Sequence, residues 1–301
     1  LLDAIPAVLE RMVIPIALTK RVDQAEALHR HVLGAGYYHH KRAAVMALCA
    51  VEMAMWDALG RATGRPLHAL WGGLYRDRAE MSEATDISLV RAVRGVVGDG
   101  VPVRADVNGA WTPGTARRQL EKLREFDLQY IEQPLEVDDL PGHAALRRAQ
   151  PVPVALDESA YTLQDVGNIV RMEAADVVLL DPHEAGGLWP VIKQAGICES
   201  VGIPVTLHSG GELGLSQAAY LHLAASIPNM TISLDTEYAH LSADIVTQRF
   251  ILDEGCFIVP TGPGLGVEVE ETALERHRVD RIEGAYLDDL RPQWFPTKPA
   301  Y

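Results

Sequence analysis

The stretch VVLLDPHEAGGLWPVIKQAGICESVGIPVTLH (residues 177–208) decides the fold. It contains two short apolar runs, Val177–Leu180 and Ile203–Leu207, and the segment between them, Leu188–Val201, is long enough for one helix. A buried strand, a helix and a second buried strand make up the repeating unit of a parallel sheet that is covered by helices. The stretch therefore predicts a protein of the α/β class.

The same unit recurs along the chain from about residue 100. The predicted strands are 101–107, 128–132, 152–156, 177–180, 203–207 and 230–234, and helix-length segments at 113–126, 141–149, 163–173, 188–201 and 213–226 alternate with them. The residues that end the strands are Asp106, Glu132, Asp157, Asp181, His208 and Asp235. A doubly wound sheet could give this spacing, but a TIM-type barrel also brings all strand ends to one mouth, where active sites lie. We therefore favour the barrel.

Composition excludes several classes of protein. The 301 residues include 27 Lys plus Arg and 41 Asp plus Glu, a formal net charge of −14, which argues against a nucleic-acid or anionic-membrane binder. Three widely spaced cysteines match no zinc or disulfide pattern and are typical of a cytoplasmic protein. We expect no transmembrane helix, because no uncharged apolar run reaches 18 residues, and no signal peptide at the amino terminus.

Carboxylates end three consecutive predicted strands. Asp106, Glu132 and Asp157 follow strands that would lie about 4.8 Å apart, so their side chains could share one cation. Oxygen ligands without Cys or His select a hard ion, Mg²⁺ before Mn²⁺. Each of these acids could instead be a solvated loop residue or a helix cap, and Glu158 could replace Asp157 as the third ligand.

The next strand ends suggest acid–base chemistry. Asp181 could accept a hydrogen bond from one nitrogen of His208 and so raise the basicity of the other nitrogen. His208 would then be a general base that points into the mouth. Asp235 could bind a substrate oxygen or His208, or could cap the helix that follows it.

Linked motifs now give a resemblance. The stretches VRADVNGAW, YIEQPL, ALDES, LLDPHEAGG, TLHSGGELG and TGPGLGVEV resemble the enolase superfamily, in its mandelate racemase/muconate lactonizing enzyme group. This resemblance implies a (β/α)7β TIM-type barrel with an α+β capping domain, Mg²⁺ on the three carboxylates, and removal of the proton α to a substrate carboxylate with the enediolate stabilised by the metal. Asn108, in the first of these motifs, is then expected to bind substrate, as is Asp235.

Within that group, the residue after the sixth barrel strand separates the branches. The muconate-lactonizing and dipeptide-epimerase branches have a lysine there, whereas this chain has Asp181, followed by His208 on the next strand. The pair resembles the His–Asp dyad of the racemase and acid-sugar dehydratase branches. The motif ALDES, however, is closer to the muconate branch.

One part of the expected barrel has no counterpart in the sequence. Residues 79–86 could form the first strand, but no second strand with the family's paired lysines fits before Asp106. We therefore expect a break near residues 86–88, where one or two βα units of the barrel are missing. The expected domains are residues 1–75 (the helical part of the cap), 76–250 (the incomplete barrel) and 251–301 (a return to the cap and a tail).

The leading hypothesis for function is a Mg²⁺-dependent dehydratase that converts a sugar acid to a 2-keto-3-deoxy acid. A racemase or epimerase of a 2-hydroxy acid, a cycloisomerase, and a non-catalytic binding protein on the same fold are the alternatives. The expected partners are a small carboxylate substrate and further copies of the chain in a homo-oligomer.

Overall fold

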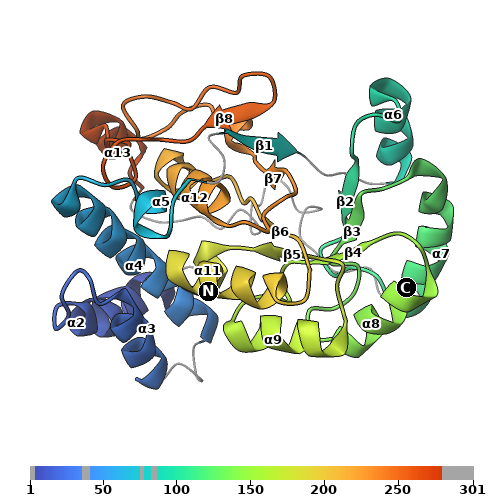
Figure 1. The fold of residues 1–301 in the computed structure, drawn as a ribbon, viewed down its shortest axis with the longest axis horizontal. Coiled ribbons are helices and arrows are strands. Elements are labelled where there is room, and N and C mark those ends of the chain that lie inside the picture. The colour runs from blue at the N-terminus through green and yellow to red at the C-terminus, as the bar shows by residue number, and fades with distance from the viewer. Residues whose placement is uncertain (1–3, 36–40, 75–77, 83–86, 280–301) are drawn as a thin grey trace.

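A computed structural model describes residues 4–35, 41–74, 78–82 and 87–279 (Figure 1). Its amino-terminal part is helical, as predicted. The elements there are α1 (Ala4–Val8), η1 (Leu9–Val13), α2 (Ile14–Ala17), α3 (Ala25–Gly34), α4 (Lys41–Thr63) and α5 (Leu67–Leu70). Val13, Leu28 and Leu48 form a separate apolar cluster that joins η1, α3 and α4 to one another.

Five parallel strands form the main sheet, in the order β2-β3-β4-β5-β6. They are β2 (Arg104–Asp106), β3 (Tyr130–Glu132), β4 (Val154–Leu156), β5 (Val177–Leu180) and β6 (Val205–Leu207). All five lie within strands predicted from the sequence, mostly in shortened form. Their consecutive order and parallel register make them part of an α/β TIM-type barrel, which confirms the expected fold class.

Helices connect the strands and cover the outer face of the sheet (Figure 1). They are α6 (Ile87–Val97), α7 (Pro113–Leu123), the short 3-10 helix η3 (Arg124–Phe126), α8 (Leu140–Ala149), α9 (Leu163–Met172), α10 (Pro182–Ala185), α11 (Leu188–Glu199) and α12 (Gly214–Ser226). Local capping fixes where several begin. Thr162 and Asp165, for example, form a reciprocal capping box at the start of α9.

A second, three-stranded sheet has the order β7-β1-β8. Its strands are β1 (Arg78–Ser82), β7 (Leu234–Asp235) and β8 (Cys256–Ile258). The short 3-10 helix η4 (Tyr238–His240) lies between β7 and β8, and α13 (Glu271–His277) follows β8. β1 is thus the first strand that the sequence predicted, parallel to β7 and antiparallel to β8. Among the described strands, none pairs with the free side of β2.

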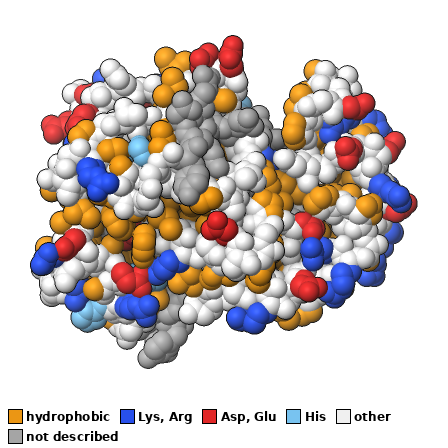
Figure 2. All heavy atoms as spheres, viewed as in Figure 1, with side chains coloured by type: hydrophobic (Ala, Val, Ile, Leu, Met, Phe, Trp, Pro, Cys, Tyr) orange, Lys and Arg blue, Asp and Glu red, His pale blue; other side chains and the backbone are white. Residues whose placement is uncertain are grey.

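The expected break in the chain falls partly on residues 83–86, which lie outside the described residues. The sheet topology nevertheless separates β1 from β2, and the surface in Figure 2 is hollowed beside α6, the helix between them. The predicted domain boundaries and the completeness of the cap stay predictions, as does the tail beyond residue 279.

The long helix α4 is the most apolar element. Its segment Ala43–Thr63 has the length and mean hydropathy (1.5) of a membrane span, but 56% of it is buried within the protein. It packs against α1, α3 and α10. The carboxylate of Glu52, buried in the middle of α4, accepts hydrogen bonds from the backbone of Leu188 and Trp189 at the start of α11. The apolar character of α4 is therefore that of a core helix.

A buried ion pair joins the two sheets. Nη1 of Arg104 in β2 lies 2.9 Å from Oδ1 of Asp235 at the end of β7, and the Arg104 side chain is only 1% exposed. The guanidinium also donates to Ser233 and Gln129, and it stacks over the ring of Tyr130. A buried charge is stabilised only when its hydrogen bonds are satisfied. Arg104 therefore fixes β2 relative to β7 across the barrel interior.

Replacement of Arg104 tests this role. We expect Arg104→Met to lower the free energy of unfolding by roughly 3–5 kcal/mol, because it leaves the Asp235 carboxylate in the interior without its cation. Urea titration followed by circular dichroism measures the change. Arg117→Met, at an exposed position in α7, is the matched control and should change stability by less than about 0.5 kcal/mol. Equal effects of the two substitutions would contradict the role of Arg104 in fixing β2 relative to β7.

Candidate metal centre and active site

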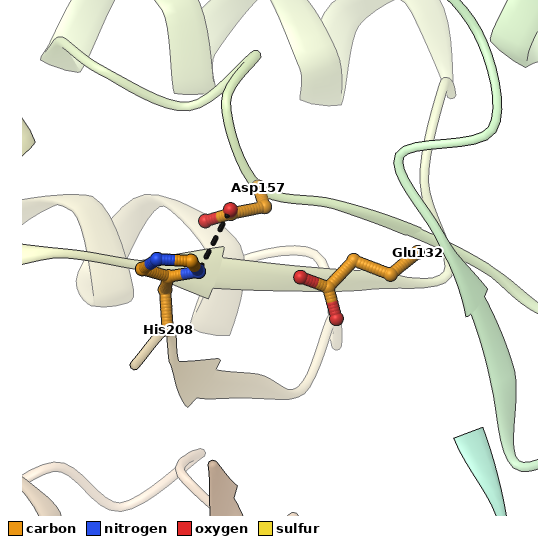
Figure 3. Close-up of side chains that lie close together, drawn as sticks. All are labelled: Glu132, Asp157 and His208. Carbon is orange, nitrogen blue, oxygen red and sulfur yellow. Dashed lines mark ion pairs between the residues drawn. The ribbon is translucent and has the colours of Figure 1, made fainter. Parts of the chain in front are cut away.

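Two carboxylates and an imidazole gather at the carboxyl ends of the strands (Figure 3). Glu132 ends β3, Asp157 follows β4 and His208 follows β6, and one ligand atom from each lies within 4.8 Å of the other two. Nδ1 of His208 is 2.9 Å from Oδ2 of Asp157. The parallel strands bring together side chains that are up to 76 residues apart in the sequence.

The carboxylates of this cluster have unsatisfied oxygens. Oε2 of Glu132 and Oδ1 of Asp157 are buried and have no hydrogen-bond partner in the described part of the chain. Buried carboxylate oxygens are costly unless a hydrogen bond or a metal satisfies them. Hard oxygen donors of this kind fit Mg²⁺, so the residues present are compatible with the cation that the sequence predicts.

Asp106, the third predicted ligand, lies beside this cluster. It is the register partner of Glu132 on the neighbouring strand. Its carboxylate accepts hydrogen bonds from the backbone and side-chain N–H groups of Asn108, whose φ of 50° is left-handed. Burial, together with the charges of Asp157 and Asp235, raises the pKa of Asp106 to about 6. The structure thus gathers two of the three predicted ligands with His208, and a local turn holds Asp106 next to them.

Electrostatic coupling runs through the cluster. Burial and the nearby carboxylates of Asp106 and Asp157 raise the pKa of Glu132 well above its ordinary value. Burial lowers the pKa of His208, but the charge and hydrogen bond of Asp157, with the charge of Asp181, outweigh it, so the net pKa is raised. Asp157 therefore holds the ring of His208 and favours its protonated form.

The sequence predicted a hydrogen bond between His208 and Asp181, but in the structure each of these residues pairs with another partner. Oδ1 of Asp181 accepts from the backbone N–H and Nδ1 of His183 and from the hydroxyl of Tyr220. His183 is only two residues away, so this contact costs little chain entropy, and Asp181 also caps α10. Asp181 still acts on His208 through its charge, but Asp157 is the residue that pairs with it.

The two residues predicted to bind substrate also have partners within the protein. Asp235 is paired with the buried Arg104, so its carboxylate takes part in the connection between the sheets. Asn108 is exposed, and its side-chain amide binds Asp106. A role for either residue in substrate binding stays a prediction.

Two further acids beside the site have perturbed pKa values. Burial and the charge of Asp157 raise the pKa of Glu158 to about 7. Burial, with the charges of Asp157 and Asp181, raises that of Glu184 to about 8. Glu158 was predicted as an alternative ligand, whereas Glu184 was not predicted, although its place three residues after Asp181 was a usable signal.

Two buried polar residues hold the loops that carry the site. Gln133, fully buried, accepts hydrogen bonds from the backbone of Asp157 and Ser159 and donates one to the carbonyl of Leu135. Glu212 accepts from Ser209 and Gly210, directly after His208. Both residues lie within the motifs YIEQPL and TLHSGGELG, but the sequence predicted no role for either, because an amide or acid that holds a loop in place has no periodic signal.

A cavity of about 240 Å³ lies between β2, β3 and α7. Asp106 reaches it, but most of its lining is apolar and none of Glu132, Asp157 and His208 takes part. The cavity therefore belongs to the layer between sheet and helices, and the chemistry of the mouth lies elsewhere.

Comparison with known proteins identifies the class. Residues 52–273 match the family "Enolase C-terminal domain-like", and residues 3–72 match "Mandelate racemase / muconate lactonizing enzyme, N-terminal domain". The chain therefore belongs to the enolase superfamily, in its mandelate racemase/muconate lactonizing enzyme group, which confirms the resemblance seen in the sequence.

Individual relatives of this chain are enzymes. It is 35% identical over 250 residues to an N-succinylamino acid racemase of an Amycolatopsis species, with 80% of this chain and 67% of the relative covered. It is 30% identical to a probable glucarate dehydratase of Streptomyces coelicolor, with 79% and 66% covered. The chain thus spans about two thirds of the length of these relatives. Further relatives are named as synthases and cycloisomerases.

A solved structure gives the same fold with a metal bound. An enolase from Thermobispora bispora, complexed with magnesium and formate, matches with a TM-score of 0.72 and 28% identity, with 78% of this chain and 68% of that chain covered.

The raised pKa of Glu184 predicts a pH-dependent stability. Its pKa is about 8 in the folded chain against an ordinary value of 4.5, so the folded state binds the proton more tightly than the unfolded state. The contribution of Glu184 to stability is therefore fully present below about pH 4.5 and is lost as the pH rises toward about 8. Glu184→Gln removes this loss, so its stability relative to wild type should increase across that window. Urea titrations at pH 5 and pH 8 measure it, and a difference independent of pH would contradict the prediction.

Proposed function

We propose that the protein abstracts the proton α to a substrate carboxylate in a Mg²⁺-dependent reaction, and that it dehydrates a sugar acid to a 2-keto-3-deoxy acid. The observation that carries this proposal is the cluster in Figure 3, where an imidazole lies against buried carboxylates with unsatisfied oxygens. Such a site pairs a cation-binding group with an acid–base group within reach of one small ligand.

Asp106, Glu132 and Asp157 would hold the cation. A bound Mg²⁺ supplies positive charge that stabilises negative charge developing on the substrate carboxylate. The protein's own part is to keep these carboxylates together against their mutual repulsion, through Gln133 and the hydrogen bonds of Asn108.

His208 would transfer the proton. Its Nδ1 is fixed by Asp157, which orients the ring and leaves Nε2 as the atom that exchanges a proton with substrate. Its raised pKa makes the neutral imidazole a stronger base than an ordinary histidine. The same residue can therefore accept the α-proton and return a proton later in the reaction.

Dehydration is favoured over cycloisomerisation by the residue types at the mouth. Asp181 stands where the resemblance places a lysine in the muconate-lactonizing and epimerase branches. Lys193, the next lysine along the chain, is bound to Glu26 on α3. The chain thus has a carboxylate where those branches use an amine, and an imidazole, His208, after the next strand.

A racemase is the second candidate. It is supported by the 35% identity to an N-succinylamino acid racemase, the highest identity over a comparable length among the relatives described above. Both reactions begin with removal of the α-proton, so the same residues serve each. A non-catalytic binding protein is the remaining alternative. For the proposed enzyme we also keep the cytoplasmic location and the homo-oligomer that the sequence predicts.

Removal of a ligand tests the metal centre. We expect Glu132→Gln and Asp157→Asn each to weaken Mg²⁺ binding at least 10-fold, because each removes a charged oxygen donor from the interior. Isothermal titration calorimetry with MgCl₂ measures the affinity. Glu121→Gln, exposed on α7, is the control and should bind as wild type does. Wild-type protein that takes up no Mg²⁺ would overturn the metal assignment.

Replacement of the imidazole tests the chemistry. In the presence of Mg²⁺ and glucarate, His208→Asn should lower turnover by about 10²–10⁴-fold, since proton transfer by a positioned side chain contributes that much. The appearance of the 2-keto-3-deoxy product is followed by its carbonyl, and α-deuterium exchange in D₂O is followed by NMR. Exchange without loss of water, seen with an N-succinylamino acid instead, would favour the racemase. No exchange with either acid would favour the binding protein.

A further inference from the structure

A second imidazole–carboxylate pair lies beside the metal centre. His183, in α10, has its Nδ1 2.8 Å from Oδ1 of Asp181 and 3.1 Å from the hydroxyl of Tyr220, which itself donates to Asp181 at 2.9 Å. The other ring nitrogen lies 3.3 Å from Oγ of Ser216. The function proposed above uses Asp181 only as a nearby charge and leaves His183 without a role.

The two pairs are built alike. In each, a carboxylate that is almost fully buried holds Nδ1 of a partly exposed imidazole. Side-chain exposure is 28% for His208 against 3% for Asp157, and 37% for His183 against 8% for Asp181. A buried acid behind a partly exposed imidazole fixes the ring, which is the arrangement of a general acid–base residue, and a ligand that reaches Nε2 of His183 would take the place of the Ser216 hydroxyl. A structural histidine of the core, such as the fully buried His143, lacks this exposure.

His183 contacts the helix that follows His208 in the chain. His208 begins the β6–α12 connection, and Nε2 of His183 contacts Ser216 in the first turn of α12. The charged and titratable groups that act on His183 are Asp181, Tyr220, Glu212 and His208, and of these His208 is the one whose charge lowers the pKa of His183. Burial lowers the pKa of His183, but the hydrogen bond and charge of Asp181 outweigh it and raise the net value. His183 can therefore carry a proton beside the mouth.

We propose that His183, held by Asp181 and Tyr220, is a second proton-transfer group of the site, and that it protonates the departing β-hydroxyl of the substrate. This inference rests on the proposed function. His208 takes the α-proton, the electron pair forms the Cα–Cβ double bond, and the Cβ–O bond breaks as His183 gives its proton to the oxygen, so water leaves. In the resulting enol, His208 returns its proton to Cβ and the enol hydroxyl gives its proton to His183. Both imidazoles regain their initial state.

The positions of the pair also bear on the choice of reaction. His183 and His208 follow neighbouring strands, β5 and β6, so they approach a ligand from the same part of the mouth. A racemase needs two groups on opposite faces of the α-carbon, whereas loss of water needs one group at each of two adjacent atoms. Two imidazoles on adjacent strands fit the second requirement.

Separating the two proton transfers tests the proposal. Full-length protein with Mg²⁺ and glucarate in D₂O is assayed for α-deuterium incorporation by NMR and for formation of the keto acid. We expect His183→Asn to retain α-exchange within a few fold of wild type while dehydration falls about 100-fold or more. His208→Asn should lose both. His31→Asn, at an exposed position in α3, is the matched control and should keep both activities.

Chemical rescue distinguishes proton transfer from a structural role. Added imidazole should restore at least part of the dehydration by His183→Ala, because the side chain is partly exposed, and it should not change wild type. A His183 variant that dehydrates as fast as wild type would overturn the proposal, and so would a variant that loses exchange and dehydration together without rescue. If wild type itself neither exchanges nor dehydrates glucarate, the proposed function fails for this acid and the role of His183 in it fails as well.

Discussion

The arrangement of the site follows from one constraint, the free-energy cost of burying several carboxylates close to one another. Glu132 and Asp157 are buried at the strand ends, and burial together with the charge of Asp157 raises the pKa values of Asp106, Glu132, Glu158 and Glu184. Carboxylates so close cannot all ionise without positive charge nearby. Protons, the imidazoles of His208 and His183 and a divalent cation can meet that requirement.

The scaffold supplies the rigidity that such a site needs, and it does so from outside the site. Gln133 braces the loop of Asp157, Glu212 braces the loop of His208, and Glu52 anchors the start of α11 to the amino-terminal helix α4. Arg104 adds a buried link between the two sheets on the side where β2 has no outer neighbour among the described strands. Each brace is a charged or amide group with most of its hydrogen bonds satisfied, so the acids are held without movement of the strands.

The sequence predicted the strands and the residues at their ends, because both follow from a simple period. Apolar runs define β2 to β6, and in a barrel the polar residue that ends each run lies at the shared mouth. The sequence alone therefore places Glu132, Asp157 and His208 near one another. The partner of each side chain could not be predicted. His208 can reach Asp157 or Asp181, and the outcome depends on His183 two residues from Asp181, a local contact that costs little chain entropy. Asp106 turned toward Asn108 for the same reason.

That local competition has a chemical consequence. If Asp181 paired with His208, the mouth would hold one oriented imidazole, and Asp157 would face the other acids without a cation from the protein. Because His183 pairs with Asp181, the acids at the ends of β4 and β5, Asp157 and Asp181, each have an imidazole of their own. The two imidazoles follow neighbouring strands, β6 and β5. A chain whose mouth has Asp181 where related branches have a lysine thus obtains two proton carriers from histidine alone, and their pKa values are raised by the same buried acids that the histidines neutralise.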